Sequence, residues 1–176
     1  MPDSASPEIA VVRADELPFI LPELVHLLQD TVASGASVGF LPPLNDEDAQ
    51  NYWNEVFQDV ARGTQVLLVA REAGQIIGSV QLALAAKPNA RHRAEVQKLF
   101  VLQTQRRRGT GRALMQEIEH TAREHGRTLL VLDTRQGDAA EKLYRQVGYI
   151  EAGVIPAYAR SATGELDGSI FFYKLL

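Results

Sequence analysis

The chain has 176 residues, of which 45% are hydrophobic and 23% charged, a composition typical of one folded globular domain. The formal net charge of -4 does not favour a general affinity for nucleic acid or for anionic membranes, so we expect neither as a partner. Because the chain contains no cysteine, disulfides, thiolate catalysis and cysteine-ligated metals are excluded.

The first part of the chain predicts a tail, an edge strand and two helices. Residues 1–7 hold two prolines and two serines, which favours a flexible tail and does not resemble a secretory signal. We expect a single domain over residues 8–176 and, since no apolar run is long enough to span a bilayer, a cytoplasmic location. Residues 8–13 predict the strand, and residues 15–31 repeat apolar residues at helical spacing. Asn45 or Asp46 can cap a second helix that ends near Gly63.

The middle of the chain predicts a hairpin and a central strand. Two β-rich runs, 66–70 and 76–85, flank a turn at 72–75. Residues 94–102 are apolar on much of both faces, which is typical of a strand inside a sheet.

The second half alternates helices with strands. An apolar stripe over residues 109–125 predicts a helix that faces the core on one side, and residues 128–132 predict a covered strand. A further helical stripe over 139–147 precedes two strands, near 149–155 and 170–175. The whole pattern predicts a mixed α/β domain without internal repeats.

A basic glycine turn, from Arg106 to Arg112, lies between the predicted strand and helix. The first amides of a helix lack intrahelical partners and carry partial positive charge, and glycine lets a ligand approach the backbone closely. The turn therefore favours a diphosphate site, with a solvated helix cap as the alternative. Neither a P-loop nor a dinucleotide fingerprint fits, because the Gly-Lys-Ser/Thr ending and a third glycine are missing.

Three strings, in order, resemble the signatures of the GNAT superfamily of acetyl-CoA-dependent N-acetyltransferases. They are Leu99-Phe100-Val101, Arg106-x-x-Gly109-x-Gly111 and Ala140-x-x-Leu143-Tyr144-x-x-x-Gly148-Tyr149. The resemblance implies a GNAT-type α/β (α+β) fold, with a mixed, mostly antiparallel central sheet of about seven strands flanked by about four helices. It implies acetyl-CoA as the acetyl donor. The four histidines show no metal-ligand spacing, so we expect no metal.

Four further strings resemble the tabtoxin resistance acetyltransferases within this superfamily. They are Gly35–Phe40, Arg93–Leu99, Leu132–Thr134 and Pro156–Leu176. This resemblance implies direct acetyl transfer to the free amine of a small, amino-acid-like molecule. A protein or peptide acetyltransferase and a non-catalytic acyl-CoA-binding sensor are the alternatives, and a homodimer is a further expectation.

The resemblance also implies which residues hold the donor. The amine and the thioester would meet where strand 94–102 splays from strand 128–133, and a backbone N–H near Leu99 would donate to the thioester carbonyl. The strand would contact the pantetheine arm, and the glycine turn would hold the diphosphate through main-chain amides. The predicted cofactor-binding residues are Leu99, Phe100, Val101, Arg106, Arg107, Arg108, Gly109, Thr110, Gly111 and Arg112.

Two residues are catalytic candidates. Glu95 lies eleven residues before Arg106, the offset at which some protein-acetylating relatives place a catalytic glutamate, and a half-buried carboxylate there would suit proton acceptance. The alternatives are an ion pair with Lys98 or Arg93, or an ordered water as the base. Tyr144 occupies the family's tyrosine position and would donate a proton to the departing sulfur, with core packing as its alternative.

Several acceptor-side residues follow from the same resemblance, and one position departs from it. Many relatives have an asparagine where this chain has Gly137 and Asp138, so either the pantetheine arm loses a contact or Asp138 replaces it. Ser34–Phe40 is a candidate substrate loop, with packing on the core as its alternative. Because carboxylates near the gap would attract a cationic amine, the candidate acceptor-binding residues are Phe40, Asp133, Tyr158 and Asp167.

Overall fold

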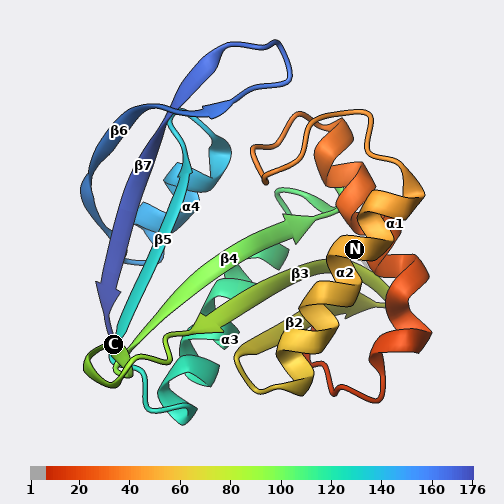
Figure 1. The fold of residues 1–176 in the computed structure, drawn as a ribbon, viewed down its shortest axis with the longest axis horizontal. Coiled ribbons are helices and arrows are strands. Elements are labelled where there is room, and N and C mark those ends of the chain that lie inside the picture. The colour runs from red at the N-terminus through yellow and green to blue at the C-terminus, as the bar shows by residue number, and fades with distance from the viewer. Residues whose placement is uncertain (1–6) are drawn as a thin grey trace, which may run out of the picture.

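Seven strands form one mixed sheet in the order β1-β2-β3-β4-β5-β7-β6 in the computed structural model, which describes residues 7–176 (Figure 1). The strands are β1 (Glu8–Val11), β2 (Gln65–Glu72), β3 (Gln75–Leu84), β4 (Arg93–Val101), β5 (Leu129–Arg135), β6 (Ile150–Arg160) and β7 (Leu166–Leu175). Neighbouring strands are antiparallel except β4 and β5, which are parallel. The predicted fold class is confirmed. Most of the predicted N-terminal tail lies outside the described residues.

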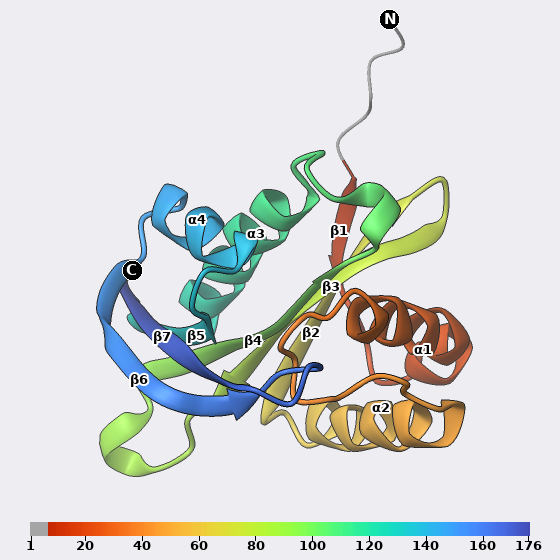
Figure 2. The ribbon, with the colours of Figure 1, turned by 90° about the horizontal axis from the view of Figure 1, so that it is seen from above.

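Four helices cover the two faces of the sheet (Figure 2). They are α1 (Leu17–Ala33), α2 (Asp46–Ala61), α3 (Thr110–Glu124) and α4 (Ala139–Gln146). The apolar stripe of α3 packs on one face, and α1 and α2 pack on the other around the fully buried Trp53. Asn45 caps α2 by accepting a hydrogen bond from the Asp48 amide at 2.7 Å, as its position predicts.

The sheet opens between β4 and β5. Backbone pairing of these two parallel strands covers only Arg93 to Glu95 on β4 and Leu129 to Val131 on β5. Beyond that point the strands diverge, β4 toward α1 and β5 toward the β6–β7 hairpin (Figure 1). The register of β4 against β3 also shifts at this level, where Lys98 has a φ of 53°. The predicted splay is therefore present, with a bulge beside it.

The β6–β7 hairpin is longer than the sequence pattern predicts. The predicted strands ended at residue 155 and began at residue 170, whereas β6 runs to Arg160 and β7 starts at Leu166. Most of β6 is exposed at the sheet edge, so its outer half has no apolar alternation to reveal it. A bulge near Ala157, whose φ is 53°, further interrupts the strand pattern.

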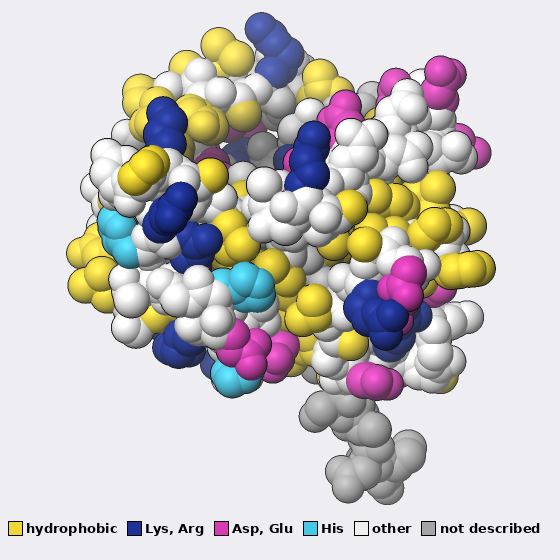
Figure 3. Space-filling view, turned by 60° about the horizontal axis from the view of Figure 1, so that its bottom comes forward, with side chains coloured by type: hydrophobic (Ala, Val, Ile, Leu, Met, Phe, Trp, Pro, Cys, Tyr) yellow, Lys and Arg dark blue, Asp and Glu magenta, His cyan; other side chains and the backbone are white. Residues whose placement is uncertain are grey.

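The surface seen in Figure 3 mixes basic, acidic and apolar side chains over one face of the molecule. Among residues 7–176, no helix has both the length and the apolarity needed to cross a bilayer. The cytoplasmic location, the homodimer and the absence of nucleic-acid and membrane partners stay predictions.

Candidate active site

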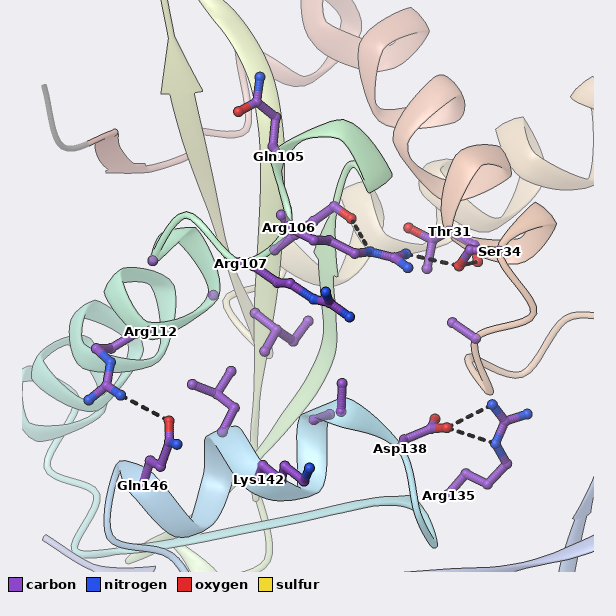
Figure 4. A pocket seen from close by; sticks show the side chains of 18 residues that line it. Thr31, Ser34, Gln105, Arg106, Arg107, Arg112, Arg135, Asp138, Lys142 and Gln146 are labelled. Carbon is purple, nitrogen blue, oxygen red and sulfur yellow. Dashed lines mark hydrogen bonds and ion pairs between the residues drawn. The ribbon is translucent and has the colours of Figure 1, made fainter. Parts of the chain in front are cut away.

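A cavity of about 640 Å³ lies where the loop after β4, the start of α3, α4 and the end of α1 converge (Figure 4). Its walls combine basic side chains with glycine and short apolar residues. Its lining includes Leu99, Val101, Arg106, Arg107, Gly109, Gly111, Arg112, Asp138, Lys142 and Leu143. Seven of the ten predicted cofactor-binding residues therefore line one space.

The two glycines of the turn have different physical roles. Gly109 is the N-cap of α3 with a φ of 91°, a conformation that glycine adopts without strain. Gly111 lets two helices approach, because a β-carbon there would lie 3.2 Å from Leu143 Cδ2 on α4. The turn thus brings the N-terminal amides of α3 to the cavity beside α4.

The arginines of the turn divide into structural and cavity-facing groups. Arg106 donates to the Val101 carbonyl at 3.1 Å and to Ser34 Oγ at 2.9 Å, so it joins the turn to the end of α1. Arg107 has a φ of 63°, and its side chain extends into the cavity (Figure 4). Arg112 donates to Gln146 on α4 at 3.0 Å.

Three predicted cofactor residues do not line the cavity. Phe100 is fully buried on the opposite face of the sheet, with its ring centroid 6.3 Å from that of Trp53. Thr110 is buried in the first turn of α3. The guanidinium of Arg108 lies 3.3 Å from Glu72 on β2. Because the side chain of Phe100 points to the other face of the sheet and that of Thr110 is buried, only the main chain of these two residues is available to contact a ligand in the cavity.

Other cavity residues were not predicted to contact the cofactor. Thr31, Ser34 and Ala36 come from the end of α1 and the loop that follows, and Lys142 and Gln146 come from α4. The two segments are far apart in sequence. The sequence marked the Ser34–Phe40 loop as a candidate for the substrate and α4 as the bearer of a signature, but it did not place either of them at the donor cavity.

Asp138, the residue near the missing family asparagine, also lines this cavity. It is the N-cap of α4 and accepts hydrogen bonds from Arg135 Nε and Nη2, at 3.0 and 2.7 Å. Its carboxylate is therefore already paired with a neighbouring guanidinium. Arg135 Nη1 also lies 3.8 Å from Asp167, which places that acceptor candidate in the same cluster of charges.

A second cavity, of about 490 Å³, is lined by three of the predicted acceptor-side or catalytic residues. Glu95, Asp133 and Tyr158 line it from β4, β5 and β6. Asp133 accepts a hydrogen bond from Ser169 Oγ at 2.6 Å. Glu95 is exposed, not half-buried as the sequence suggested, because the face of β4 that carries it is not covered by α1 or α2 at this level.

Phe40 lines a third cavity, of about 300 Å³, between the 34–42 loop and the tip of the β6–β7 hairpin. The ring of Phe40 packs edge-on against Tyr52, with centroids 5.2 Å apart. Ala36 and Arg135 line both this cavity and the first one. The two cavities are therefore adjacent to each other.

Tyr144 is a buried residue of α4. Its ring lies 6.0 Å, centroid to centroid, from both Tyr149 and Phe172. Burial raises the pKa of the Tyr144 phenol, and the nearby carboxylates of Asp133 and Asp138 raise it further. The side chain has a packing role, and its phenol is held in the protonated form that an acid requires.

Comparison with known proteins identifies the family. The family model described as "Acetyltransferase (GNAT) family" matches residues 28–149, which include the β4 strand, the glycine turn and Tyr144. The chain belongs to the GNAT acetyltransferase family. An uncharacterized N-acetyltransferase of Azospirillum brasilense is 33% identical over 132 residues, or 73% of this chain and 77% of that protein.

Two solved structures share the fold of this GNAT enzyme. A ribosomal-protein-alanine N-acetyltransferase from Brucella melitensis has a TM-score of 0.78 at 24% identity, covering 96% of this chain and 99% of that one. A putative acetyltransferase from Salmonella typhimurium, solved with its cofactor acetyl-CoA, has a TM-score of 0.77 at 16% identity, covering 98% and 95%. The prediction of an acetyl-CoA-dependent N-acetyltransferase is confirmed at the level of the family.

Proposed function

We propose that this GNAT enzyme moves the acetyl group of acetyl-CoA directly to the primary amine of a small, amino-acid-like molecule. One observation carries this proposal: a basic, glycine-lined cavity and a carboxylate-lined cavity flank the same opening between β4 and β5. The first suits an anionic donor, and the second suits a cationic acceptor.

The donor side fits acetyl-CoA by its chemistry. The α3 amides and Arg107 supply positive potential for a diphosphate, while Leu99 and Val101 supply an apolar wall for the pantetheine arm. Past Glu95 the edge of β4 has no pairing with β5, so its main-chain groups are available to extend the sheet onto the arm. We assign the remaining predicted donor contacts, Phe100 and Thr110, to the main chain.

The chemistry needs a neutral amine and stabilisation of charge on the thioester oxygen. Glu95, directly or through water, would accept the amine proton, and a backbone N–H near Leu99 would donate to the oxygen as charge develops. One such preorganised donor contributes roughly 3 to 4 kcal/mol in comparable acyl-transfer sites. Tyr144 would supply the proton to the departing thiolate.

The 34–42 loop and the β6–β7 hairpin favour a small acceptor, because the space that they line together has a volume of only about 300 Å³. Phe40, Asp133 and Tyr158 would contact it, while Asp167 acts through Arg135. The tabtoxin resistance resemblance supports an amino-acid-like compound. The Brucella structure, named for a ribosomal protein, is the reason to keep a protein acceptor as the second candidate.

A screen of amines against the purified protein tests the proposal, with coenzyme A release as the readout. Small amines should release coenzyme A at rates well above acceptor-free hydrolysis, and N-terminal peptides should not. Release with peptides alone would favour the protein acceptor. Tight acetyl-CoA binding with no release for any amine or peptide would favour the sensor.

A further inference from the structure

Lys98 lies in the bulge of β4, and its side chain contacts the 34–42 loop. Its Nζ donates a hydrogen bond to the carbonyl oxygen of Val38 at 2.6 Å. Gly39 is the next residue of that loop, and a β-carbon there would lie only 3.1 Å from Nζ. The ammonium is thus held against the loop that lines the acceptor-side space.

The backbone at Lys98 is in a conformation that residues with a β-carbon rarely adopt, with a φ of 53°. Strain of this kind persists only where the surrounding structure fixes it, and it concentrates at functional sites. Here the bulge between β3 and β4 fixes it, beside the opening of the sheet.

The charge of Lys98 is incompletely matched by the protein. Among residues 7–176, the carbonyl of Val38 is the one acceptor that Nζ reaches, although an ammonium has three donors. Burial lowers the pKa of Lys98, and the carboxylates of Asp133 and Glu95 offset that effect only in part. Among the described residues no carboxylate forms a direct ion pair with this partly buried ammonium, so it can take an anionic group of a ligand as a partner.

We propose that Lys98 binds a carboxylate of the acceptor, so that the preferred substrate is an amine that also carries an anionic group. This inference rests on the proposed function. Glu95 and Asp133 would attract the ammonium end of such a zwitterion, while Lys98 takes the opposite end. The acceptor would thereby be oriented with its nitrogen toward the opening between β4 and β5.

Matched substrate pairs test this assignment. The probes are the proteinogenic L-amino acids and β-alanine, each beside its own methyl ester, which keeps the amine and removes the negative charge. The wild-type enzyme should prefer the acid of its best pair. Lys98→Met should lower the acid-to-ester ratio of kcat/KM at least tenfold while the KM for acetyl-CoA changes less than about twofold. Because the comparison is between enzymes, the different reactivities of acid and ester cancel.

Two further variants separate charge from loop packing. Lys98→Arg keeps the cation and should retain most of the preference, whereas Lys87→Met removes an exposed lysine outside the site and should leave the ratio unchanged. If Lys98→Met does not fold, Gly39→Ala serves instead, since it displaces Nζ and should raise the KM of the acid. Gly63→Ala, also at a positive φ but with open space around it, controls for backbone strain.

The possible outcomes separate a role of Lys98 in substrate binding from a role in loop packing. Equal loss on acid and ester in Lys98→Met would reduce Lys98 to a loop contact and overturn the inference. A wild-type enzyme that prefers esters or plain amines would also overturn it, while leaving the proposed function intact. Failure of every amine would remove the proposed function and the inference together.

Discussion

At the scale of single residues, burial determines that the Tyr144 phenol keeps its proton. An ordinary tyrosine phenol already titrates well above neutral pH, and burial together with two nearby carboxylates raises the pKa of Tyr144 further. The proton therefore stays on the phenol over the range in which an amine becomes a nucleophile. A phenol that keeps its proton suits the proposed role of Tyr144 as the acid for the leaving thiolate.

Tyr144→Phe should lower kcat by more than about tenfold, because the variant keeps the ring and removes only the acid. The affinity for acetyl-CoA should change little, since Tyr144 does not line the donor cavity. Since the pKa is raised, the wild-type rate should show no fall assignable to Tyr144 as pH rises to about 9. Steady-state rates across pH, with calorimetry of acetyl-CoA binding, check this. Unchanged rates at every pH would exclude Tyr144 from the mechanism.

A buried ion pair joins α3 to β7 at the scale of elements. Lys174 Nζ lies 2.8 Å from both carboxylate oxygens of Glu119 and donates to the Val147 carbonyl at 2.6 Å. Glu119 is only 7% exposed, so its carboxylate would stay largely shielded from solvent if the lysine were removed. The pair therefore fixes the helix, the strand and the end of α4 relative to one another.

Lys174→Met should destabilise the protein by about 3 to 5 kcal/mol, since it leaves the Glu119 carboxylate buried and uncompensated. The double variant Glu119→Leu/Lys174→Met should recover most of that loss. Urea unfolding of the three proteins measures it. Arg62→Met, which breaks the exposed pair with Asp59, is the control and should cost less than about 1 kcal/mol. A Lys174→Met loss as small as that of the control would contradict the role given to the buried pair.

Ligand binding and folding are linked at the scale of the whole molecule. The cavity proposed for acetyl-CoA takes walls from α1, β4, α3 and α4, so the space exists only when these elements are assembled. A ligand that binds there stabilises the folded chain, by about 2.7 kcal/mol at a concentration one hundred times its Kd.

Acetyl-CoA at that concentration should raise the Tm by roughly 5 to 10 °C, given the sensitivity expected for a chain of this size. Arg107→Ala should reduce the shift measured at the same ligand concentration, because its side chain extends into the cavity. Arg108→Ala should keep most of it, since that guanidinium is directed to Glu72. Differential scanning calorimetry with and without acetyl-CoA checks both. Equal loss of the shift in the two variants would place the diphosphate elsewhere on the turn.

The sequence by itself determined most of the elements, the family and the place of the proposed donor site. Apolar periodicity located α3 and β5, turn chemistry located the β2–β3 hairpin, and the string from Arg106 to Gly111 located the glycine turn that lines the first cavity. These features depend on contacts between residues that are near in sequence, and a pattern of residue types is sufficient to reveal them. The sequence pattern missed only the outer half of the β6–β7 hairpin, because most of β6 is exposed and carries no apolar alternation there.

Only the tertiary structure decided which side chains face which cavity. The bulge of β4 and alternation along the strand put Phe100 into the core, left Glu95 exposed and set Lys98 against Val38, a residue 60 positions away. The same assembly directs the Arg108 guanidinium to Glu72 and the Arg107 side chain into the cavity. Such pairings depend on how distant segments meet, and sequence spacing does not contain that information.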